Sequence, residues 1–404
     1  MGDKRYYERM AVIKDENKIK ELLTRYVEKV FPSLEKAEEM LKSGKELTFY
    51  LGVDPTGPSI HLGNATNLLV LKKLINLGHR IIFLIGDFTA RVGDPTGKDL
   101  VRKSLSQNDI KENMKSYTNQ VEKILPRGSF SVEYNSKWYN KFGFGEIIDL
   151  TSKFTVQQMI VRDMFQERLK NDKPIHVHEF LYPIMQGYDS VAMEVDGEIG
   201  GNDQTFNMLV GRDLVKDYLG KEKLVITTKL LVDPKTGKKI MNKSEGSYIA
   251  VNDSPDEMFG KIMAVPDSSI IPLFDNATEL SDAIIQEVVQ RLQKGDNPKI
   301  LKEELGHEIV KMYHGEQEAD RAKENFNNVF SEGKNPEEIN EVENKENIIQ
   351  TIVVAGIVSS KSEAKRLINQ GAVKVNDKTV EEWEYKLKSG DTVKIGPRKF
   401  LKIK

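Results

Sequence analysis

A strand–helix–strand pattern near the start of the chain constrains its fold more than any other feature. The apolar run ELTFYLGVD ends at a turn, the helical stretch HLGNATNLLVLKKLINLG follows, and the next run is IIFLIG, all within residues 46–86. Continuous apolar runs of the last kind are typical of parallel strands that are buried on both faces. The three segments together predict a βαβ unit.

The same alternation returns between residues 178 and 233. HEFLYPIMQGYDSVAME predicts a helix, with Pro183 tolerated only near the helix start because an interior proline removes a backbone hydrogen bond. VDGEIGG then predicts a strand, NDQTFNMLVGRDLVKDYLG a helix, and KLVITTKLLVD another strand. With a helical stretch at residues 5–45, this order predicts a Rossmann-like, doubly wound α/β domain with a parallel sheet over residues 1–232.

The rest of the chain divides by composition into four further segments. Residues 233–247 form a loop rich in Gly, Lys and Ser, and residues 248–331 have a helical composition. Residues 332–347 are polar and acidic, which is typical of a linker. The last segment, residues 348–404, predicts a small α+β domain.

Charge is distributed unevenly along these segments. The whole chain of 404 residues has 60 Lys and Arg against 62 Asp and Glu, whereas residues 348–404 contain 12 basic and 6 acidic residues. A basic module on an acidic body favours contact with an anion such as nucleic acid. Chance surface charge is the alternative explanation.

Composition excludes several kinds of site. The chain has no cysteine, so disulfides, thiolate metal sites and cysteine nucleophiles are excluded. Its 6 histidines include one close pair, His176 and His178, and we expect no resident metal. The N-terminal segment is charged, unlike a secretory signal, and the longest apolar run is far below the roughly 18 residues that span a bilayer. We therefore expect a cytoplasmic protein that does not bind membranes.

The first motif that carries chemistry is YLGVDPTGPSIHLGN, residues 50–64, between the first strand and its helix. Phosphates favour helix N-termini at the carboxyl ends of parallel strands. Gly52 and Gly63 let a nucleotide approach the backbone closely, and His61 and Asn64 can donate hydrogen bonds to phosphate oxygens. Taken alone, the motif is also compatible with an ordinary helix start that contains a hydrogen-bonded histidine.

The second motif is MNKS, residues 241–244, which follows Lys238 and Lys239. A lysine in a loop after a late strand can fold over a triphosphate and neutralise the charge that develops during reaction. Taken alone, the loop favours the other interpretation of Lys243, as a solvated surface lysine.

In combination, the two motifs resemble the two signatures of class I aminoacyl-tRNA synthetases. HLGN is similar to the HIGH tetrapeptide after the first strand, and IMNKS is similar to the KMSKS loop. Within that class, the segments YLGVDPTGPSIHLGN, FTARVGDPTGK, YPIMQGYD and GGNDQ resemble the tyrosyl-tRNA synthetase family. The basic C-terminal segment is similar to the small RNA-binding domain of the S-four type, which bacterial-type tyrosyl enzymes carry at this end.

The sequence departs from these signatures at two places. Asn64 stands where HIGH has its second histidine, and it keeps a hydrogen-bond donor. In the loop, Ile240 stands at the first lysine of KMSKS and Asn242 replaces a serine. Lys239, one position earlier, is the candidate substitute for that lysine.

The YPIMQGYD segment predicts a polar face inside an apolar helix. Tyr182, Gln186 and Asp189 stand at positions i, i+4 and i+7, so they share one face. A polar stripe between apolar residues suits an amino-acid pocket, and the solvent face of an amphipathic surface helix is the alternative.

The resemblance implies a role for each motif residue. Tyr50 and Asp189 would hydrogen-bond the phenol of tyrosine, and Gln204 would lie beside its carboxylate. The ammonium group would be bound by Asp94, Tyr182 and Gln186. The residues around ATP would be Gly52, Asp54, Thr56, His61, Gly63, Asn64, Gly201, Asp203, Met241 and Lys243. The catalytic residues would be Thr56, His61, Asn64, Lys98, Arg102 and Lys243.

The implied reaction needs no protein nucleophile. The tyrosine carboxylate attacks the α-phosphate of ATP to give tyrosyl-adenylate and pyrophosphate, and the terminal ribose of tRNA(Tyr) then attacks the adenylate. The protein contributes positioning and charge stabilisation, and Mg²⁺ accompanies ATP without a dedicated protein cage. If Tyr50 and Asp189 face the phenol, phenylalanine leaves both unpaired.

The resemblance also implies a homodimer, with residues 151–171 near the interface.

The sequence leaves two other functions open. A tryptophanyl-tRNA synthetase shares the fold and a HLGN-like motif, although it would lack the C-terminal module and the pair formed by Tyr50 and Asp189. An RNA-binding protein on an inactive synthetase scaffold is compatible with the altered IMNKS loop.

Overall fold

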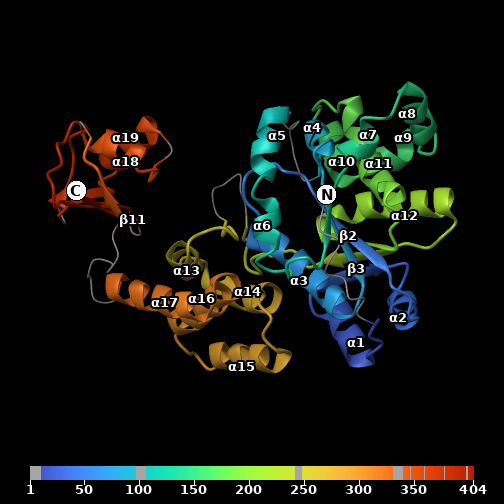
Figure 1. Ribbon diagram of the computed structural model, residues 1–404, viewed down its shortest axis with the longest axis horizontal. Helices are drawn as coiled ribbons and strands as arrows, with labels where there is room; N and C mark the ends of the chain where they lie inside the picture. The colour runs from blue at the N-terminus through green and yellow to red at the C-terminus, as the bar shows by residue number, and fades with distance from the viewer. Residues whose placement is uncertain are drawn as a thin grey trace. The chain divides into compact units, whose positions relative to one another are not determined.

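The computed structural model describes residues 11–96, 106–241, 248–330, 340–345, 347–358, 360–376, 378–396 and 399–404. Its contacts divide the chain into two compact units, each drawn in Figure 1. The first unit comprises residues 1–253 and 265–301, and the second comprises residues 254–264 and 302–404. The sequence-based boundaries are finer than this division and remain a prediction.

A six-stranded sheet forms the centre of the first unit, in the order β1-β6-β5-β2-β3-β4. Its strands are β1 (Val27–Phe31), β2 (Thr48–Val53), β3 (Arg80–Ile85), β4 (Ser131–Tyr134), β5 (Gly197–Gly201) and β6 (Leu224–Thr228). All neighbours are parallel except β1 and β6, which are antiparallel. The sheet is therefore the predicted doubly wound parallel sheet with one antiparallel edge strand added.

The edge strand β1 corrects the expectation that residues 5–45 are helical throughout. The described part of this segment forms α1 (Glu16–Thr24), β1 and α2 (Leu34–Lys42). Charged residues make VEKVF resemble a helix locally, but its backbone pairs with β6, with Val27 opposite Thr228. Tertiary pairing thus overrides the local propensity.

The order of the strands fixes where a ligand can bind. From β2 the chain continues through α3 (Leu62–Asn76) to β3 on one side, while β5 lies on the other side of β2. In open α/β sheets, such a reversal leaves a crevice at the carboxyl ends of the strands. The crevice of this unit therefore lies beyond Val53 and Gly201.

Helix α11 (Val177–Ala192) supplies part of the wall of this crevice, and it packs against α12 (Thr205–Leu219). They approach closely because two glycines meet: a Cβ on Gly187 would lie 3.0 Å from the backbone nitrogen of Gly211. Pro183 lies inside α11, six residues after its first residue. The expectation that Pro183 stands near the helix start is therefore wrong, because the helix begins earlier and continues through the proline.

The remaining described helices of the first unit are short. The α-helices are α4 (Thr89–Val92), α5 (Gln107–Met114), α6 (Tyr117–Val121), α7 (Ser136–Tyr139), α8 (Phe144–Thr151), α9 (Val156–Ile160), α10 (Asp163–Lys170), α14 (Ile270–Ala277) and α15 (Asp282–Gln293). Two 3₁₀ turns, η1 (Asn202–Gln204) and η3 (Asp267–Ser269), complete them. Within the residues that the structure describes, no helix has the length and apolar content to cross a membrane.

The second unit contains a helical part and a small sheet. Helices α13 (Pro255–Met263) and α17 (Glu316–Phe330) pack together, and α16 (Pro298–His314) precedes α17. Phe259 is fully buried, and Gly306 leaves room for its ring, since a Cβ there would lie 3.0 Å from it.

The small sheet has the order β7-β11-β10-β8-β9 and is covered by α18 (Ile348–Val354) and α19 (Lys361–Asn369). Its strands are β7 (Asn340–Val342), β8 (Val373–Val375), β9 (Lys378–Thr379), β10 (Thr392–Ile395) and β11 (Lys399–Ile403). Strand β7 lies in the segment that the sequence predicts as a linker. It pairs in parallel with β11, and Glu341 forms ion pairs with Lys402 and Lys404.

Candidate active site

A cavity of about 310 Å³ opens at the carboxyl ends of β2 and β5. Fifteen of the residues that the sequence assigns to the site line it: Tyr50, Gly52, Asp54, Thr56, His61, Gly63, Asn64, Asp94, Tyr182, Gln186, Asp189, Gly201, Asp203, Gln204 and Met241. Three predicted cations, Lys98, Arg102 and Lys243, lie outside the described residues. The structure therefore brings together, at one cavity, all of the assigned residues that it describes.

The start of α3 joins the two sequence motifs in space. His61 occupies the N-cap position of α3, and the backbone of Leu62 donates a hydrogen bond to Ile249 at 3.0 Å. Ile249 in turn donates to the sulfur of Met241 at 3.4 Å. Both flanks of the IMNKS loop thus lie beside the first turn of α3.

One buried carboxylate, Asp189 on α11, marks the inner end of the cavity. Its Oδ1 accepts a hydrogen bond from the indole of Trp138 at 2.8 Å, and its Oδ2 accepts one from the amide of Asn135 at 3.3 Å. Burial raises the pKa of Asp189 to about 8, against the lowering effect of these hydrogen bonds. Sequence reasoning missed Asn135 and Trp138, and the only signal was the rarity of tryptophan, with two in the chain.

Tyr50 on β2 lies fully buried beside this carboxylate. Its hydroxyl is 3.1 Å from Oγ of Ser190 and 3.4 Å from the backbone carbonyl oxygen of Gln186. Burial raises the pKa of Tyr50, so the hydroxyl keeps its proton at neutral pH and can donate it in a hydrogen bond.

The opposite part of the wall is acidic and is held by side-chain hydrogen bonds. The hydroxyl of Tyr182 donates to Oδ2 of Asp54 at 2.9 Å, and the amide of Gln204 donates to Oδ2 of Asp94 at 2.8 Å. The hydroxyl of Thr96 donates to the other oxygen of Asp94 at 2.6 Å. Two fixed carboxylates beside hydrogen-bonding side chains suit a cation such as an ammonium group.

Lys239 faces this acidic wall. Its Nζ lies 2.8 Å from Oδ2 of Asp203, and it is the only lysine or arginine among the described residues that line the cavity. Lys239 stands one position before the place of the first lysine of KMSKS, and its side chain nevertheless reaches the cavity. Asp203, expected beside ATP, is here the partner of Lys239.

Sequence reasoning also missed a buried charge pair at the cavity: Glu198 on β5, which lines the cavity, and Lys223 before β6, which lies behind it. Both side chains are at most 3 % exposed. A charged residue in the otherwise apolar and glycine-rich segment VDGEIGG was the available signal for Glu198, and no local signal distinguished Lys223 from a surface lysine.

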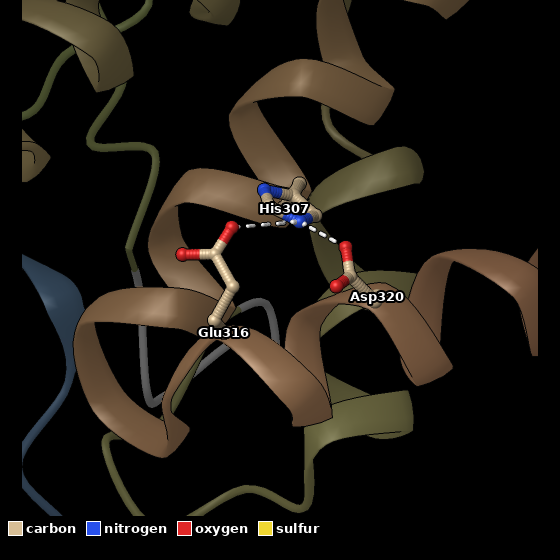
Figure 2. Close-up of side chains that lie close together, drawn as sticks. All are labelled: His307, Glu316 and Asp320. Carbon is tan, nitrogen blue, oxygen red and sulfur yellow. Dashed lines mark hydrogen bonds and ion pairs between the residues drawn. The ribbon is translucent and has the colours of Figure 1, made fainter.

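A cluster that could hold a metal lies in the second unit and not at the cavity. In the part of the chain that the structure describes, His307, Glu316 and Asp320 form the one such group (Figure 2). His307 lies 2.8 Å from Asp320 and 3.9 Å from Glu316, whose other oxygen pairs with Lys311. Both carboxylate side chains are more than half exposed, so we interpret the group as an ion-pair network that links α16 to α17.

A parallel sheet with a ligand cavity at its strand reversal, and a helix that starts with HLGN beside that cavity, define a class I aminoacyl-tRNA synthetase fold. Residues 42–331 match the family described as tRNA synthetases class I (W and Y), and residues 349–393 match the S4 domain. The chain belongs to this class I synthetase family and carries an S4 domain at its C-terminal end.

Curated relatives support the same assignment along nearly the whole chain. The tyrosine–tRNA ligase of Carboxydothermus hydrogenoformans is 43% identical over 95% of this chain and 97% of its own length. Tyrosine–tRNA ligase 2 of Clostridium acetobutylicum is 41% identical over 95% of this chain and 97% of its own length.

Solved structures share the fold at lower identity. The C-terminally truncated mitochondrial tyrosyl-tRNA synthetase of Aspergillus nidulans has a TM-score of 0.64 at 24% identity, covering 78% of this chain and 93% of its own. The Archaeoglobus fulgidus tyrosyl-tRNA synthetase, solved with L-tyrosine, has a TM-score of 0.59 at 20% identity, covering 76% of this chain and 99% of its own.

Proposed function

We propose that this chain is a tyrosine–tRNA ligase, which activates L-tyrosine with ATP and transfers it to the 3′ end of tRNA(Tyr). The observation that carries the proposal is the pair of buried groups, Tyr50 and Asp189, in the wall of the cavity. A phenol both donates and accepts a hydrogen bond, and a carboxyl group with a neighbouring hydroxyl supplies both partners. The curated relatives named above carry the same activity in their names.

In this proposal the two ends of the cavity bind the two ends of tyrosine. The phenol lies between Tyr50 and Asp189, and the ammonium group lies beside Asp94, Tyr182 and Gln186. Gln204, whose amide is bonded to Asp94, lies next to the substrate carboxylate. The carboxylate is thereby held in position to attack the α-phosphate of ATP.

The ATP side of the cavity combines glycines with hydrogen-bond donors. Gly52, Gly63 and Gly201 line it without side chains, and the start of α3 offers the positive end of a helix dipole. We assign contacts with ATP also to Asp54, Thr56, His61, Asn64, Asp203 and Met241. Mg²⁺ would enter bound to the phosphates of ATP.

Charge stabilisation needs cations, because the described cavity wall contains five carboxylates and one lysine. We assign this role to Lys98, Arg102 and Lys243, with Lys239 as the further lysine of the IMNKS loop. The ion pair between Lys239 and Asp203 supports this last assignment, because it holds the lysine at the cavity before ATP arrives.

Transfer to tRNA would use the C-terminal module. The S4 domain match and the excess of basic residues in residues 348–404 both support contact with the phosphates of tRNA(Tyr). We also keep the predicted division into a catalytic domain (1–232), a loop (233–247), a helical domain (248–331), a linker (332–347) and this module (348–404) as part of the proposal.

A homodimer is the proposed assembly. The neighbouring helices α8, α9 and α10 and the start of α11 expose large apolar side chains to an unusual extent for a monomer: Phe144, Ile148, Val156, Val161, Leu169 and Val177, each between 51% and 79% exposed. These helices overlap residues 151–171, the segment that the resemblance places near a dimer interface. A second copy of the chain is the proposed cover for these side chains.

Charging of tRNA tests this function. Purified protein, ATP and radiolabelled tyrosine should transfer label to tRNA(Tyr), and labelled tryptophan should not transfer to tRNA(Trp). Charging with tryptophan would favour the tryptophanyl alternative, and no charging with either amino acid would favour the inactive scaffold.

A further inference from the structure

A fully buried lysine, Lys223, lies behind the amino-acid end of the cavity. Its side chain has no exposed surface, and its ammonium group has three acceptors: the carboxylate of Glu198, Oγ of Ser190 at 2.7 Å and the carbonyl oxygen of Met208 at 3.3 Å. Burial lowers the pKa of Lys223, and the carboxylate of Glu198 opposes that shift. Three acceptors for three N–H groups make a site that is built for an ammonium ion.

The backbone also makes room for this ammonium group. A Cβ on Gly211 would lie 2.5 Å from Nζ of Lys223, 3.0 Å from Oγ of Ser190 and 3.2 Å from Cα of Gly187. The 2.5 Å contact would displace the ammonium group, and the contacts with Ser190 and Gly187 on α11 would be tighter than ordinary packing. The absence of a side chain at Gly211 therefore leaves room both for the ammonium group and for α11.

One arm of the network runs from Lys223 to Tyr50. The lysine only donates, so Oγ of Ser190 must accept from it, and the serine proton then points elsewhere. The hydroxyl of Tyr50 lies 3.1 Å from that oxygen, where either hydroxyl can be the donor, and the direction that concerns us is donation from Ser190 to Tyr50. With Ser190 as the donor, Tyr50 keeps its own O–H to donate, either to the carbonyl of Gln186 at 3.4 Å or to a phenol oxygen in the cavity.

The other arm runs from Lys223 to the ammonium end. The carboxylate of Glu198 only accepts, and its second oxygen receives the side-chain amide of Gln186 at 2.9 Å. The amide nitrogen of Gln186 therefore points to Glu198, and its carbonyl oxygen points the other way, where Asn207 donates to it at 3.0 Å. A carbonyl oxygen accepts two hydrogen bonds, so Gln186 presents an acceptor to a substrate ammonium group.

We propose that Lys223 is a positioning residue that sets the direction of the hydrogen bonds at both ends of the amino-acid site, through Ser190 to Tyr50 and through Glu198 to Gln186. It makes Tyr50 a donor to the phenol and Gln186 an acceptor for the ammonium group, although it touches neither substrate group itself. This inference rests on the proposed binding of tyrosine in the cavity.

The test compares two variants in ATP–pyrophosphate exchange, each of which removes one buried cation. Lys223→Met should raise the KM for tyrosine about tenfold and lower discrimination against phenylalanine, with the KM for ATP nearly unchanged, since one misdirected hydrogen bond near a charge has about that effect. Arg168→Met is the matched control. Arg168 pairs with Glu179 at 2.5 Å with both side chains at most 5 % exposed, but its partner bonds to the backbone of His176 and not to the cavity. The control should lose stability and keep the wild-type KM for tyrosine.

A double variant keeps the test valid if Lys223→Met does not fold. Lys223→Met combined with Glu198→Gln removes both charges, so no unpaired charge stays buried, and it should show the same rise in the KM for tyrosine. A folded double variant with the wild-type KM and wild-type discrimination would overturn the positioning role alone. Wild-type protein without any tyrosine-dependent exchange would instead remove the proposed function and this inference together.

Discussion

The two ends of the chain place their polar groups in opposite ways. In the first unit, Asp189, Glu198 and Lys223 lie inside the protein, paired with neutral side chains or with each other. In the C-terminal module, the described core consists of aliphatic side chains such as Ile352, Val373 and Val393, while the lysines of α19 are exposed.

This difference follows from the size of the proposed ligands. A single amino acid can be surrounded, so buried polar groups lose their best partner when the wrong amino acid enters, and that loss is large because water cannot replace the partner. A tRNA cannot be surrounded by 57 residues. Exposed cations attract its phosphates instead, and that attraction weakens in salt.

The largest expected effect is at Asp189. Asp189→Ala removes the carboxylate that Trp138 and Asn135 hold in place, so discrimination of tyrosine over phenylalanine in ATP–pyrophosphate exchange should fall by about a hundredfold or more. The KM for ATP should stay close to that of the wild type. Unchanged selectivity would show that this face of α11 does not bind the phenol.

The burial of Asp189 should also appear in the pH dependence of stability. Its pKa is about 8 in the folded protein against an ordinary value of 3.8, so between these values the folded state keeps a proton that the unfolded state has lost. The free energy of unfolding should therefore fall as pH rises through this window, by up to about 1.4 kcal/mol per pH unit from this group.

Asp189→Asn cannot titrate at this position and serves as the comparison. Urea unfolding of both proteins at pH 5, 6, 7 and 8 should give a difference in stability that moves steadily in favour of the asparagine variant as pH rises. A constant difference over the whole range would contradict a raised pKa for Asp189.

For the C-terminal module, the informative measurement is the salt dependence of tRNA binding and not amino-acid selectivity. Lys361 and Lys365 stand one turn apart on α19 and are exposed. Replacing both with alanine should weaken binding of tRNA(Tyr) roughly fivefold and lower the slope of log affinity against log salt by about 0.7–0.9 per lost phosphate contact. Amino-acid activation without tRNA should not change. A loss of exchange activity in this variant would break the separation between the two regions.

The smallest effect is expected at the exposed ion pair between α16 and α17 (Figure 2). Asp320 is 68% exposed and lies 2.8 Å from His307, so solvent screens their attraction. Asp320→Asn should lower the free energy of unfolding by about 0.5 kcal/mol, measured in urea. A loss of several kcal/mol would show that this cluster is more than a surface ion pair.

Local patterns predicted the parts of the fold that depend on neighbouring residues. The apolar runs around β2 and β3 and the spacing of Tyr182, Gln186 and Asp189 are visible in a short window, so the sheet centre and the polar face of α11 followed from the sequence. Strand β1 did not, because its partner β6 lies about 200 residues away and its own composition resembles a helix.

The buried network shows a second limit of sequence reasoning. Lys223 and Glu198 each resemble an ordinary surface charge, and only the folded backbone brings them together at the cavity. Asn135 and Trp138 lie more than 50 residues before Asp189 and belong to no motif that sequence reasoning recognised. The roles of Lys98, Arg102 and Lys243 stay predictions from the resemblance.

The most direct test of the account is amino-acid-dependent ATP–pyrophosphate exchange with the unmodified protein. Tyrosine, tryptophan and phenylalanine should be compared at equal concentration, without tRNA. The account predicts rapid exchange with tyrosine and exchange near background with the other two, because only tyrosine gives Tyr50 and Asp189 a polar partner. Exchange that depends on tryptophan, or none with any of the three, would contradict it.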